Sequence, residues 1–318
     1  MNIDLPSDFN YSPSFLRVII PGLSFTISVI IAPLSIYLYF NNYLLLFKII
    51  NSDKFSLSVA IISISILIGI LINSIERPLI QFLEGYSLKD FLPKSVFSKM
   101  QIYQYKESIK LIEERNNLVT STGLKSNIQK DRLYDDIYNY YSIYLYYIYH
   151  ANLDEEEVTS SLMPTTLGNI FRSIEVYPNW KYGMDGVFFW HRLKSYISEQ
   201  ESIDLDERYA FVNMYTYLSL IFGLSYFIFE ILSIFSMGKI LAIIFSVIAL
   251  IFLFLSILCY NILLDSAVLY GHSVRSMFDL HRKELLDKFN LKTMNIDPKS
   301  EEKEIWRSIK EYLYYPTD

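Results

Sequence analysis

The chain has 318 residues, 52% of them hydrophobic, with a mean hydropathy of +0.25 and a net charge of −6. Nucleic-acid partners favour a basic protein face, so this acidic balance without a Lys/Arg run argues against one. Cys259 is the only cysteine, which excludes an intramolecular disulfide and a cysteine-based metal site within one chain.

Four uncharged stretches are each long enough to cross a bilayer: residues 18–40, 57–75, 209–229 and 240–264. A helix needs about 20 apolar residues to cross roughly 30 Å of hydrocarbon, and a soluble helix rarely stays apolar on every face for that length. The sequence therefore predicts an all-α integral membrane protein with four transmembrane helices in two pairs. The N-terminal residues lack the basic region of a cleaved signal, so we expect the first span to remain as an anchor.

The spans divide the chain into four predicted regions. These are an N-terminal transmembrane hairpin (1–75), a cytoplasmic helical domain (76–208), a C-terminal transmembrane hairpin (209–264) and a cytoplasmic helical extension and tail (265–318). Of the 28 Lys and Arg residues, fifteen fall in the second region and nine in the fourth. Because basic residues mark the cytoplasmic side of a membrane, we predict that both termini and residues 76–208 are cytoplasmic.

Small and hydroxyl residues line one face of three spans. They are Ser24, Ser28 and Ser35 in the first span, Ser58, Ser65, Gly69 and Asn73 in the second, and Ser219 and Gly223 in the third. Such residues let helix backbones approach closely in lipid, so these stripes predict packing seams. A water-filled pore lining is the alternative.

Glu230 is the one charge embedded in a span. A carboxylate in hydrocarbon costs about a few kcal/mol and commonly marks an ion path or a buried partner. Glu230 also lies about 10 Å from the predicted outer end of its helix. Two interpretations stay open: an interfacial residue with its head in water, or a bundle-facing functional residue that contacts a permeating cation or pairs with Lys48, Lys54 or Lys239.

The third and fourth spans are joined by residues 237–239, a connection so short that it predicts an antiparallel hairpin. A helical pattern continues beyond the fourth span to about Phe289, with Gly271 as a candidate hinge. Further on, Asp297 and Pro298 predict the N-cap and first position of a short amphipathic helix.

Residues 97–119 and the tyrosine-rich stretch 127–150 both predict long helices within the cytoplasmic region. Downstream, Thr165 or Thr166 can cap a helix that Pro178 would end. The YGMDG motif then turns the chain and caps a further short helix.

Residues spread over most of the chain form a pattern. Its members are Glu84, Gly85, Tyr86, Pro164, Thr165, Leu167, Gly168, Asn169, Glu175, Tyr182, Gly183, Asp185, Trp190, Arg192, Leu193, Tyr270, Gly271, Phe278, Asp279, Arg282, Glu304 and Trp306. The pattern resembles a family of uncharacterised bacterial four-span membrane proteins. This resemblance implies the topology and a bacterial source, with no established activity. The chain departs from the family pattern at Thr166 and His191, where arginine and proline are expected, which weakens a catalytic role for His191.

Polar residues between the hairpins form the main candidate site. Arg172, Glu175, Asp185 and Arg192 predict an internal salt-bridge network beneath the membrane. Alternatively, Arg172 and Arg192 form a pocket for an anionic ligand, with Asn169 as a hydrogen-bond donor. The sequence leaves both interpretations open.

Common catalytic signatures are missing: the sequence holds no Walker loop, GxGxxG, GxSxG or HExxH motif. His281 and Glu284 are spaced to share a metal, but two ligands make a weak site. We therefore predict no catalytic, cofactor-binding or metal residues. The leading hypothesis is a bacterial inner-membrane protein that serves as a membrane-anchored interaction or assembly component, as a homo-oligomer or with a protein partner. The first alternative is a homo-oligomeric ion channel or pore-forming effector gated by its cytoplasmic domain, and the second is a membrane-bound enzyme of unknown reaction.

Overall fold

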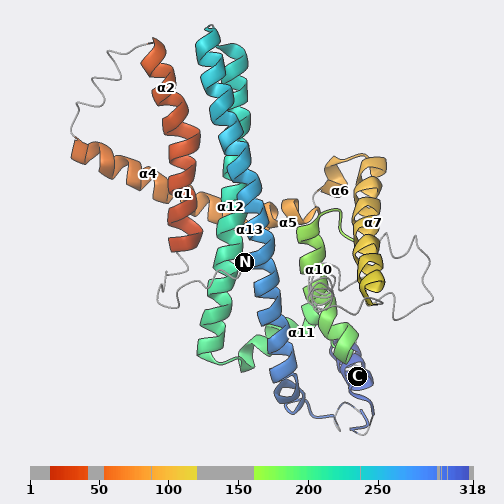
Figure 1. The fold of residues 1–318 in the computed structure, drawn as a ribbon. Helices are drawn as coiled ribbons and strands as arrows, with labels where there is room; N and C mark the ends of the chain where they lie inside the picture. Colours follow the sequence, from red (N-terminus) through yellow and green to blue (C-terminus); the bar gives the residue numbers. More distant parts are fainter. Residues whose placement is uncertain are drawn as a thin grey trace. The chain divides into compact units, whose positions relative to one another are not determined.

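The computed structural model describes residues 15–41, 54–86, 88–119, 161–236, 238–291, 294, 296–298 and 300–314. Within these ranges every regular element is a helix and no strand occurs (Figure 1), which confirms the predicted all-α class. The predicted helix 127–150 lies outside the described residues. The chain divides into two compact units. Unit 1 comprises Met1–Ile80 and Asp206–Ser266, and unit 2 comprises Gln81–Leu205 and Ala267–Asp318.

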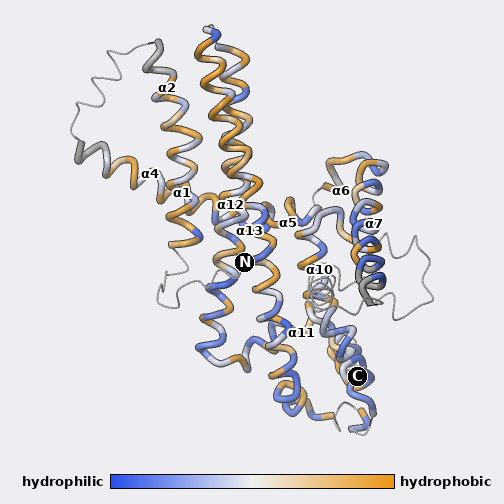
Figure 2. Tube along the Cα trace, in the orientation of Figure 1, coloured by the Kyte–Doolittle hydropathy of each residue, from blue (hydrophilic) through white to orange (hydrophobic). Residues whose placement is uncertain are grey.

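Three described helices are long and apolar enough to cross a membrane: Phe15–Ile36, α12 (Glu199–Phe235) and α13 (Lys239–Leu286). A fourth candidate is the pair formed by α4 (Lys54–Ser74) and α5 (Glu76–Glu84), which bends by 59°. The apolar run of the fourth candidate ends at this bend, because α5 is amphipathic and carries charges. Figure 2 shows long hydrophobic stretches along α12 and α13. The described residues therefore include the helices of a membrane-spanning protein, three of them or four if the bent pair is one span.

The first candidate span alternates between two helix types. It consists of the π-helical turns η1 (Phe15–Ile19) and η2 (Thr26–Ile31) and the α-helices α1 (Ile20–Phe25) and α2 (Ala32–Asn41). Each π-helical turn ends two residues before a proline, at Pro21 and at Pro33. A proline ring collides with the carbonyl four residues earlier in an α-helix, and a wider turn makes room for it.

Two glycines set how closely η1 and α1 approach α4 within unit 1. A Cβ atom on Gly22 would lie 2.0 Å from the carbonyl oxygen of Ser65, and one on Gly69 would lie 2.0 Å from that of Val18. Only hydrogen fits in this space. Ser65 is itself buried, so the second-span stripe is a packing seam at Ser65 and Gly69.

Serines join α12 to α13. Ser219 and Ser256 exchange hydroxyl-to-carbonyl hydrogen bonds at 3.4 and 2.9 Å, while the Ser233 hydroxyl donates to the Ala242 carbonyl at 3.0 Å and contacts the Ser246 hydroxyl at 2.8 Å. The earlier α12 serine thus pairs with the later position on α13, and the later α12 serine pairs with the start of α13. The two helices pack antiparallel, as the short connection at 237–239 predicts.

Helix α13 exposes a second, apolar face. Only 11% of its most apolar 18-residue stretch is buried within the protein. The exposed side chains recur every three or four residues: Ile240, Ile243, Val247, Leu250, Phe254 and Ile257. This spacing is that of one helix face, which suits contact with lipid.

The helical extension beyond the fourth span is confirmed, since α13 is one continuous helix to Leu286. Gly271 is not a hinge, because α13 passes through it without a break. A Cβ atom at Gly271 would lie 2.7 Å from Cδ1 of Ile174. Glycine at this position therefore permits α13 to pack closely against α10 (Thr166–Tyr182) within unit 2.

The remaining helices of unit 2 are α6 (Leu88–Phe91), α7 (Lys94–Val119), α11 (Gly186–Leu193), the 3₁₀ turn η3 (Lys194–Tyr196) and α14 (Glu302–Tyr314). Helix α7 confirms the prediction for 97–119. The amphipathic C-terminal helix is also confirmed, but its predicted start at Asp297 and Pro298 is wrong. The Asp297 carbonyl instead accepts a hydrogen bond from the Ser300 amide at 3.1 Å, which closes a turn ahead of the helix.

Two predicted helix caps are confirmed around α10 and α11. The Thr165 hydroxyl accepts from the Gly168 amide at 3.0 Å, and the Asp185 carboxylate accepts from the Phe188 amide at 2.9 Å. The predicted end of α10 at Pro178 is wrong, because the helix runs on to Tyr182 and closes at Gly183 with φ of +73°. The additional helical turn places tyrosine and lysine side chains against α13. Rules based on neighbouring residues do not include this tertiary contact.

Candidate functional site

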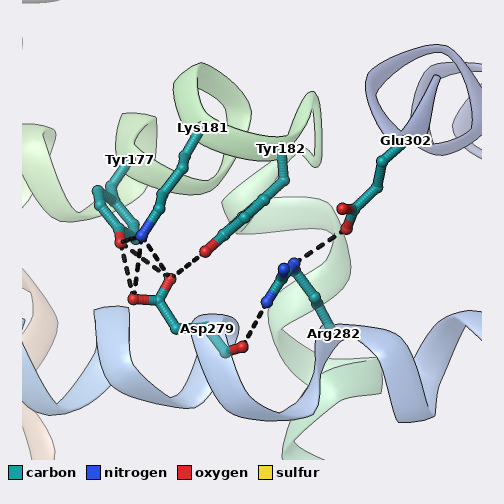
Figure 3. Close-up of polar contacts among 6 residues, drawn as sticks. All are labelled: Tyr177, Lys181, Tyr182, Asp279, Arg282 and Glu302. Carbon is teal, nitrogen blue, oxygen red and sulfur yellow. Dashed lines mark hydrogen bonds and ion pairs between the residues drawn. The ribbon is translucent and has the colours of Figure 1, made fainter.

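Asp279, on α13, accepts hydrogen bonds from three side chains of α10 (Figure 3). The Tyr177 hydroxyl donates at 2.8 and 2.9 Å to its two carboxylate oxygens, the Tyr182 hydroxyl donates at 2.6 Å, and the Lys181 ammonium lies 3.2 Å away. Lys181 also donates to the Tyr177 hydroxyl at 2.6 Å. One carboxylate thereby fastens α10 to α13.

The electrostatics of these groups follow from their partners. Burial alone would lower the pKa of Lys181, but hydrogen bonds to Tyr177, Tyr182 and Asp279 outweigh it and raise that pKa above its ordinary value. Burial, followed by the hydrogen bond to Asp279, raises the pKa of the Tyr182 phenol. The ammonium therefore stays charged and the phenol stays neutral at physiological pH.

Arg282, one helical turn after Asp279, extends the contacts to α14. Its Nη1 donates to the Asp279 carbonyl, and its Nε donates to the Glu302 carboxylate at 2.9 Å. The guanidinium carbon lies 3.9 Å from the centre of the Tyr182 ring, while Glu302 also accepts from the indole nitrogen of Trp306 at 3.3 Å. Figure 3 shows Arg282 between α13 and α14.

Asp185 fixes α11 to α14. Besides capping α11, its carboxylate lies 2.5 Å from the ammonium of Lys310. Burial tends to raise the pKa of Asp185, but hydrogen bonds from Lys310 and from the Phe188 amide hold it below its usual range. This predicted site residue thus has a charge partner on α14 that the sequence did not single out.

Asn169 is fully buried and braces the turn that precedes α10. Its amide oxygen accepts from the Met163 amide at 2.9 Å. Its amide nitrogen donates to the carbonyls of Met163 and Thr165, both at 3.1 Å, and to the Gln104 side chain at 3.3 Å. Both ends of the Asn169 amide are therefore engaged within the protein.

Of the five predicted site residues, Arg172 and Glu175 form an ion pair with each other, at 3.3 Å, with side chains 41% and 37% exposed. Arg192 is exposed, donates to the Phe188 carbonyl at 2.8 Å and stacks 4.1 Å from the centre of that ring. Among the described residues, no hydrogen bond or ion pair joins Arg172 to Arg192, or either arginine to Asn169. The structure brings the five residues into one unit but not into one cluster.

Glu84, at the end of α5, is buried outside the apolar runs. Its carbonyl accepts from the Thr165 hydroxyl at 2.8 Å, which ties it to the start of α10. Burial, and then the negative charge of Glu175, raise the pKa of Glu84 to about 7. Glu84 is therefore partly protonated near neutral pH.

His281 lies between two carboxylates. Its Nε2 is 3.2 Å from Glu201, and its Nδ1 is 3.4 Å from Glu284. Across the described part of the chain, no group of three or more His, Cys, Asp or Glu residues is placed to hold a metal ion. The predicted spacing of His281 and Glu284 corresponds here to a hydrogen-bonded helix contact.

Glu230 is partly exposed on α12 and follows Phe229, which is buried against Phe245 at a ring separation of 5.9 Å. Within the described residues, Glu230 and Lys239 form no ion pair. The side chains of the other two proposed partners, Lys48 and Lys54, lie outside the described part. The choice between an interfacial and a bundle-facing Glu230 therefore stays a prediction.

Sequence reasoning missed the residues that hold unit 2 together: Tyr177, Lys181, Glu302 and Lys310. Asp279 and Arg282 appeared only through the family resemblance. A usable signal existed, because Asp279 and Arg282 place opposite charges on one face of a helix that continues from an apolar span. The identity of their partners required the fold.

No family model, curated protein or solved structure matches this chain. The resemblance to bacterial four-span proteins accordingly stays a prediction that rests on the residues quoted for it.

Proposed function

We propose that the protein is a membrane-anchored interaction or assembly component of a bacterial inner membrane. In this proposal the helices of unit 1 hold the chain in the bilayer, and unit 2 presents a rigid helical surface to a protein partner. The proposal places both termini and residues 76–208 in the cytoplasm, as the distribution of Lys and Arg favours.

The observation that carries the proposal is the Asp279 cluster, defined as Tyr177, Lys181, Tyr182, Asp279, Arg282 and Glu302. These side chains join α10, α13 and α14 by hydrogen bonds and ion pairs. Their polar groups are directed at one another and fix the backbone of three helices. Such pre-organisation lowers the entropy lost when a surface binds, which suits a docking platform.

The first experiment is a pull-down of the tagged full-length protein from its native membrane in mild detergent, followed by intact-mass measurement. We expect a heteromeric complex of reproducible stoichiometry. Asp279→Asn should lower partner recovery, because it loosens α10 from α13, whereas Asp204→Asn, an exposed site, should not. Gel filtration of each variant checks that equal amounts of folded protein are compared.

A closed homo-oligomer without another protein would contradict the proposal. It would favour the homo-oligomeric channel instead, and ion flux with Glu230→Gln as the control variant would then be the measurement to make. The topology is tested separately by a fluorescent-protein fusion at Asp318. Fluorescence that requires export of the fusion would overturn the cytoplasmic placement.

A further inference from the structure

Unit 1 buries several polar side-chain atoms that have no hydrogen-bond partner within the part of the chain that the structure describes. Asn213 and Thr216, on α12, are both 0% exposed. Among the described residues, neither amide atom of Asn213 has a hydrogen-bond partner, and the same is true of the Thr216 hydroxyl and of Nε of Arg17. All three residues sit within or beside predicted apolar spans, where unsatisfied polar groups are least tolerated.

These groups share one side of α12. Nη2 of Arg17 donates to the Asp206 carbonyl at 3.1 Å, and the guanidinium carbon lies 5.3 Å from the centre of the Tyr209 ring. Asn213 is four residues after Tyr209 and four before Tyr217, so it lies on the same helix face between them.

The polar row extends to a second helix. The Tyr217 hydroxyl, on a side chain that is 0% exposed, donates to the Asn73 side chain of α4 at 3.5 Å, the outer limit of a hydrogen bond. Thr216 lies three residues beyond Asn213 and therefore also on its side of α12. Three segments of unit 1, η1, α4 and α12, thus contribute polar groups to one buried region.

The chemistry of the orphaned atoms selects the ligand. The Asn213 amide both donates and accepts, the Thr216 hydroxyl does the same, and Nε of Arg17 only donates. The amide oxygen of Asn213 disfavours an anion, and the Arg17 guanidinium disfavours a cation. A small neutral molecule that donates and accepts at once fits all three residues.

We propose that this region is an internal water site, in which water hydrogen-bonds Asn213, Thr216 and Nε of Arg17 inside the membrane-spanning unit. Buried waters typically make about three hydrogen bonds to polar groups that otherwise lack partners. Water at this site would supply hydrogen bonds to the polar atoms of α12 and η1 that have no partner among the described residues. It does not depend on the assembly role proposed for unit 2.

X-ray hydroxyl-radical footprinting of the full-length protein in lipid nanodiscs tests the site directly, because bound water generates radicals beside it even where bulk solvent cannot reach. Tyr217 is the reporter and Phe229, equally buried in unit 1, is the control. We expect modification of Tyr217 several-fold faster than that of Phe229, and a loss of this excess in Asn213→Leu. Equal, slow modification of both residues would overturn the proposal.

Thr216→Val gives a second test with little change of shape. If water binds the hydroxyl, the valine should lower the midpoint of thermal unfolding by about 2–4 °C, the shift expected for one lost hydrogen bond in a chain of moderate size. The matched control is Thr26→Val, whose buried hydroxyl donates to the Gly22 carbonyl at 2.8 Å and so calibrates a directly satisfied group. An unchanged or higher midpoint for Thr216→Val would mean a dry site and would overturn the proposal.

Discussion

The two units of this protein are held together by different kinds of contact. In unit 1, helices approach through residues with little or no side chain, as Gly22 and Gly69 do against the backbone of their neighbours. In unit 2, glycines such as Gly168 and Gly271 also allow close approach, but the helices are joined in addition by long charged and aromatic side chains around Asp279 and Trp306. The same chain therefore uses two packing strategies.

The difference is the one expected if unit 1 lies in lipid and unit 2 in water, as we propose. Lipid is as apolar as a leucine side chain, so burying apolar surface gives no driving force between helices in a bilayer, and close backbone packing replaces it. In water, burial of rings such as the fully buried Trp306 and Phe189 contributes strongly, and ion pairs add specificity at the edges. A substitution that disrupts the characteristic contacts of one unit should therefore leave the stability of the other unit unchanged.

Gly22→Ala should have the largest effect, because its new methyl group would lie 2.0 Å from the Ser65 carbonyl oxygen. The α1 and α4 backbones would have to separate, which we expect to cost about 3 kcal/mol or more of stability. Thermal unfolding in mild detergent measures this loss. Gly238→Ala is the control, since its nearest neighbour would be 4.0 Å away. Equal behaviour of the two variants would contradict the close-packing account of unit 1.

Glu84→Gln removes a carboxylate whose ionised form is disfavoured by burial in unit 2. The folded-state pKa of about 7 lies above the ordinary value of 4.5, so the folded protein binds the extra proton between these pH values. Stability associated with Glu84 is therefore fully present below about pH 4.5 and is lost as pH rises through about 7, to a total of about 3 kcal/mol.

We expect wild-type protein to lose unfolding stability between pH 5 and pH 8 and Glu84→Gln to lose distinctly less, so that the variant is the more stable protein at pH 8. Urea denaturation at both pH values gives the comparison. Glu199→Gln, at an exposed site of the same unit, controls for the loss of a negative charge. Parallel pH profiles for wild type and Glu84→Gln would show that the carboxyl is not buried as described.

Asp279→Asn should weaken unit 2 by about 2 kcal/mol. Hydrogen bonds to a charged acceptor are stronger than neutral ones, and the amide leaves one tyrosine hydroxyl or Lys181 with a poorer partner. The ion pair itself adds little, because the side chains of Lys181 and Asp279 are 43% and 36% exposed. Hydrogen exchange of α10 in the full-length protein should increase, while that of α1 and α4 stays unchanged. Increased hydrogen exchange in both units would contradict the claim that the Asp279 contacts stabilise unit 2 alone.

The sequence was informative where structure depends on neighbours in the chain. The apolar runs predicted the long helices, and the caps at Thr165 and Asp185 were recognisable from residue type and position. The continuation of α13 to Leu286 was also visible, because a helical period persists after the apolar run ends.

Local rules failed where distant partners decide the outcome. Pro178 predicts a helix end, yet α10 continues for four residues and so places Lys181 and Tyr182 against Asp279. Tyr177 and Tyr182 lie 102 and 97 residues from Asp279 in sequence, beyond any helical or turn pattern. The role of Asn169 could not be predicted either. An asparagine that hydrogen-bonds a buried turn and one that donates to a ligand look the same in the sequence.

Arg172→Ala should have the smallest effect and sharpens the comparison from within unit 2. Its ion pair with Glu175 spans one turn of a helix with both side chains more than a third exposed, so its removal should change stability by no more than about 0.5 kcal/mol. A thermal midpoint close to wild type, measured beside Asp279→Asn, would show that burial and geometry, not the number of charges, determine which contacts hold this unit. A large loss would instead show that Arg172 has a structural role that its exposure does not suggest. Loss of partner capture with an unchanged midpoint would assign Arg172 to recognition, as the anionic-ligand hypothesis predicts.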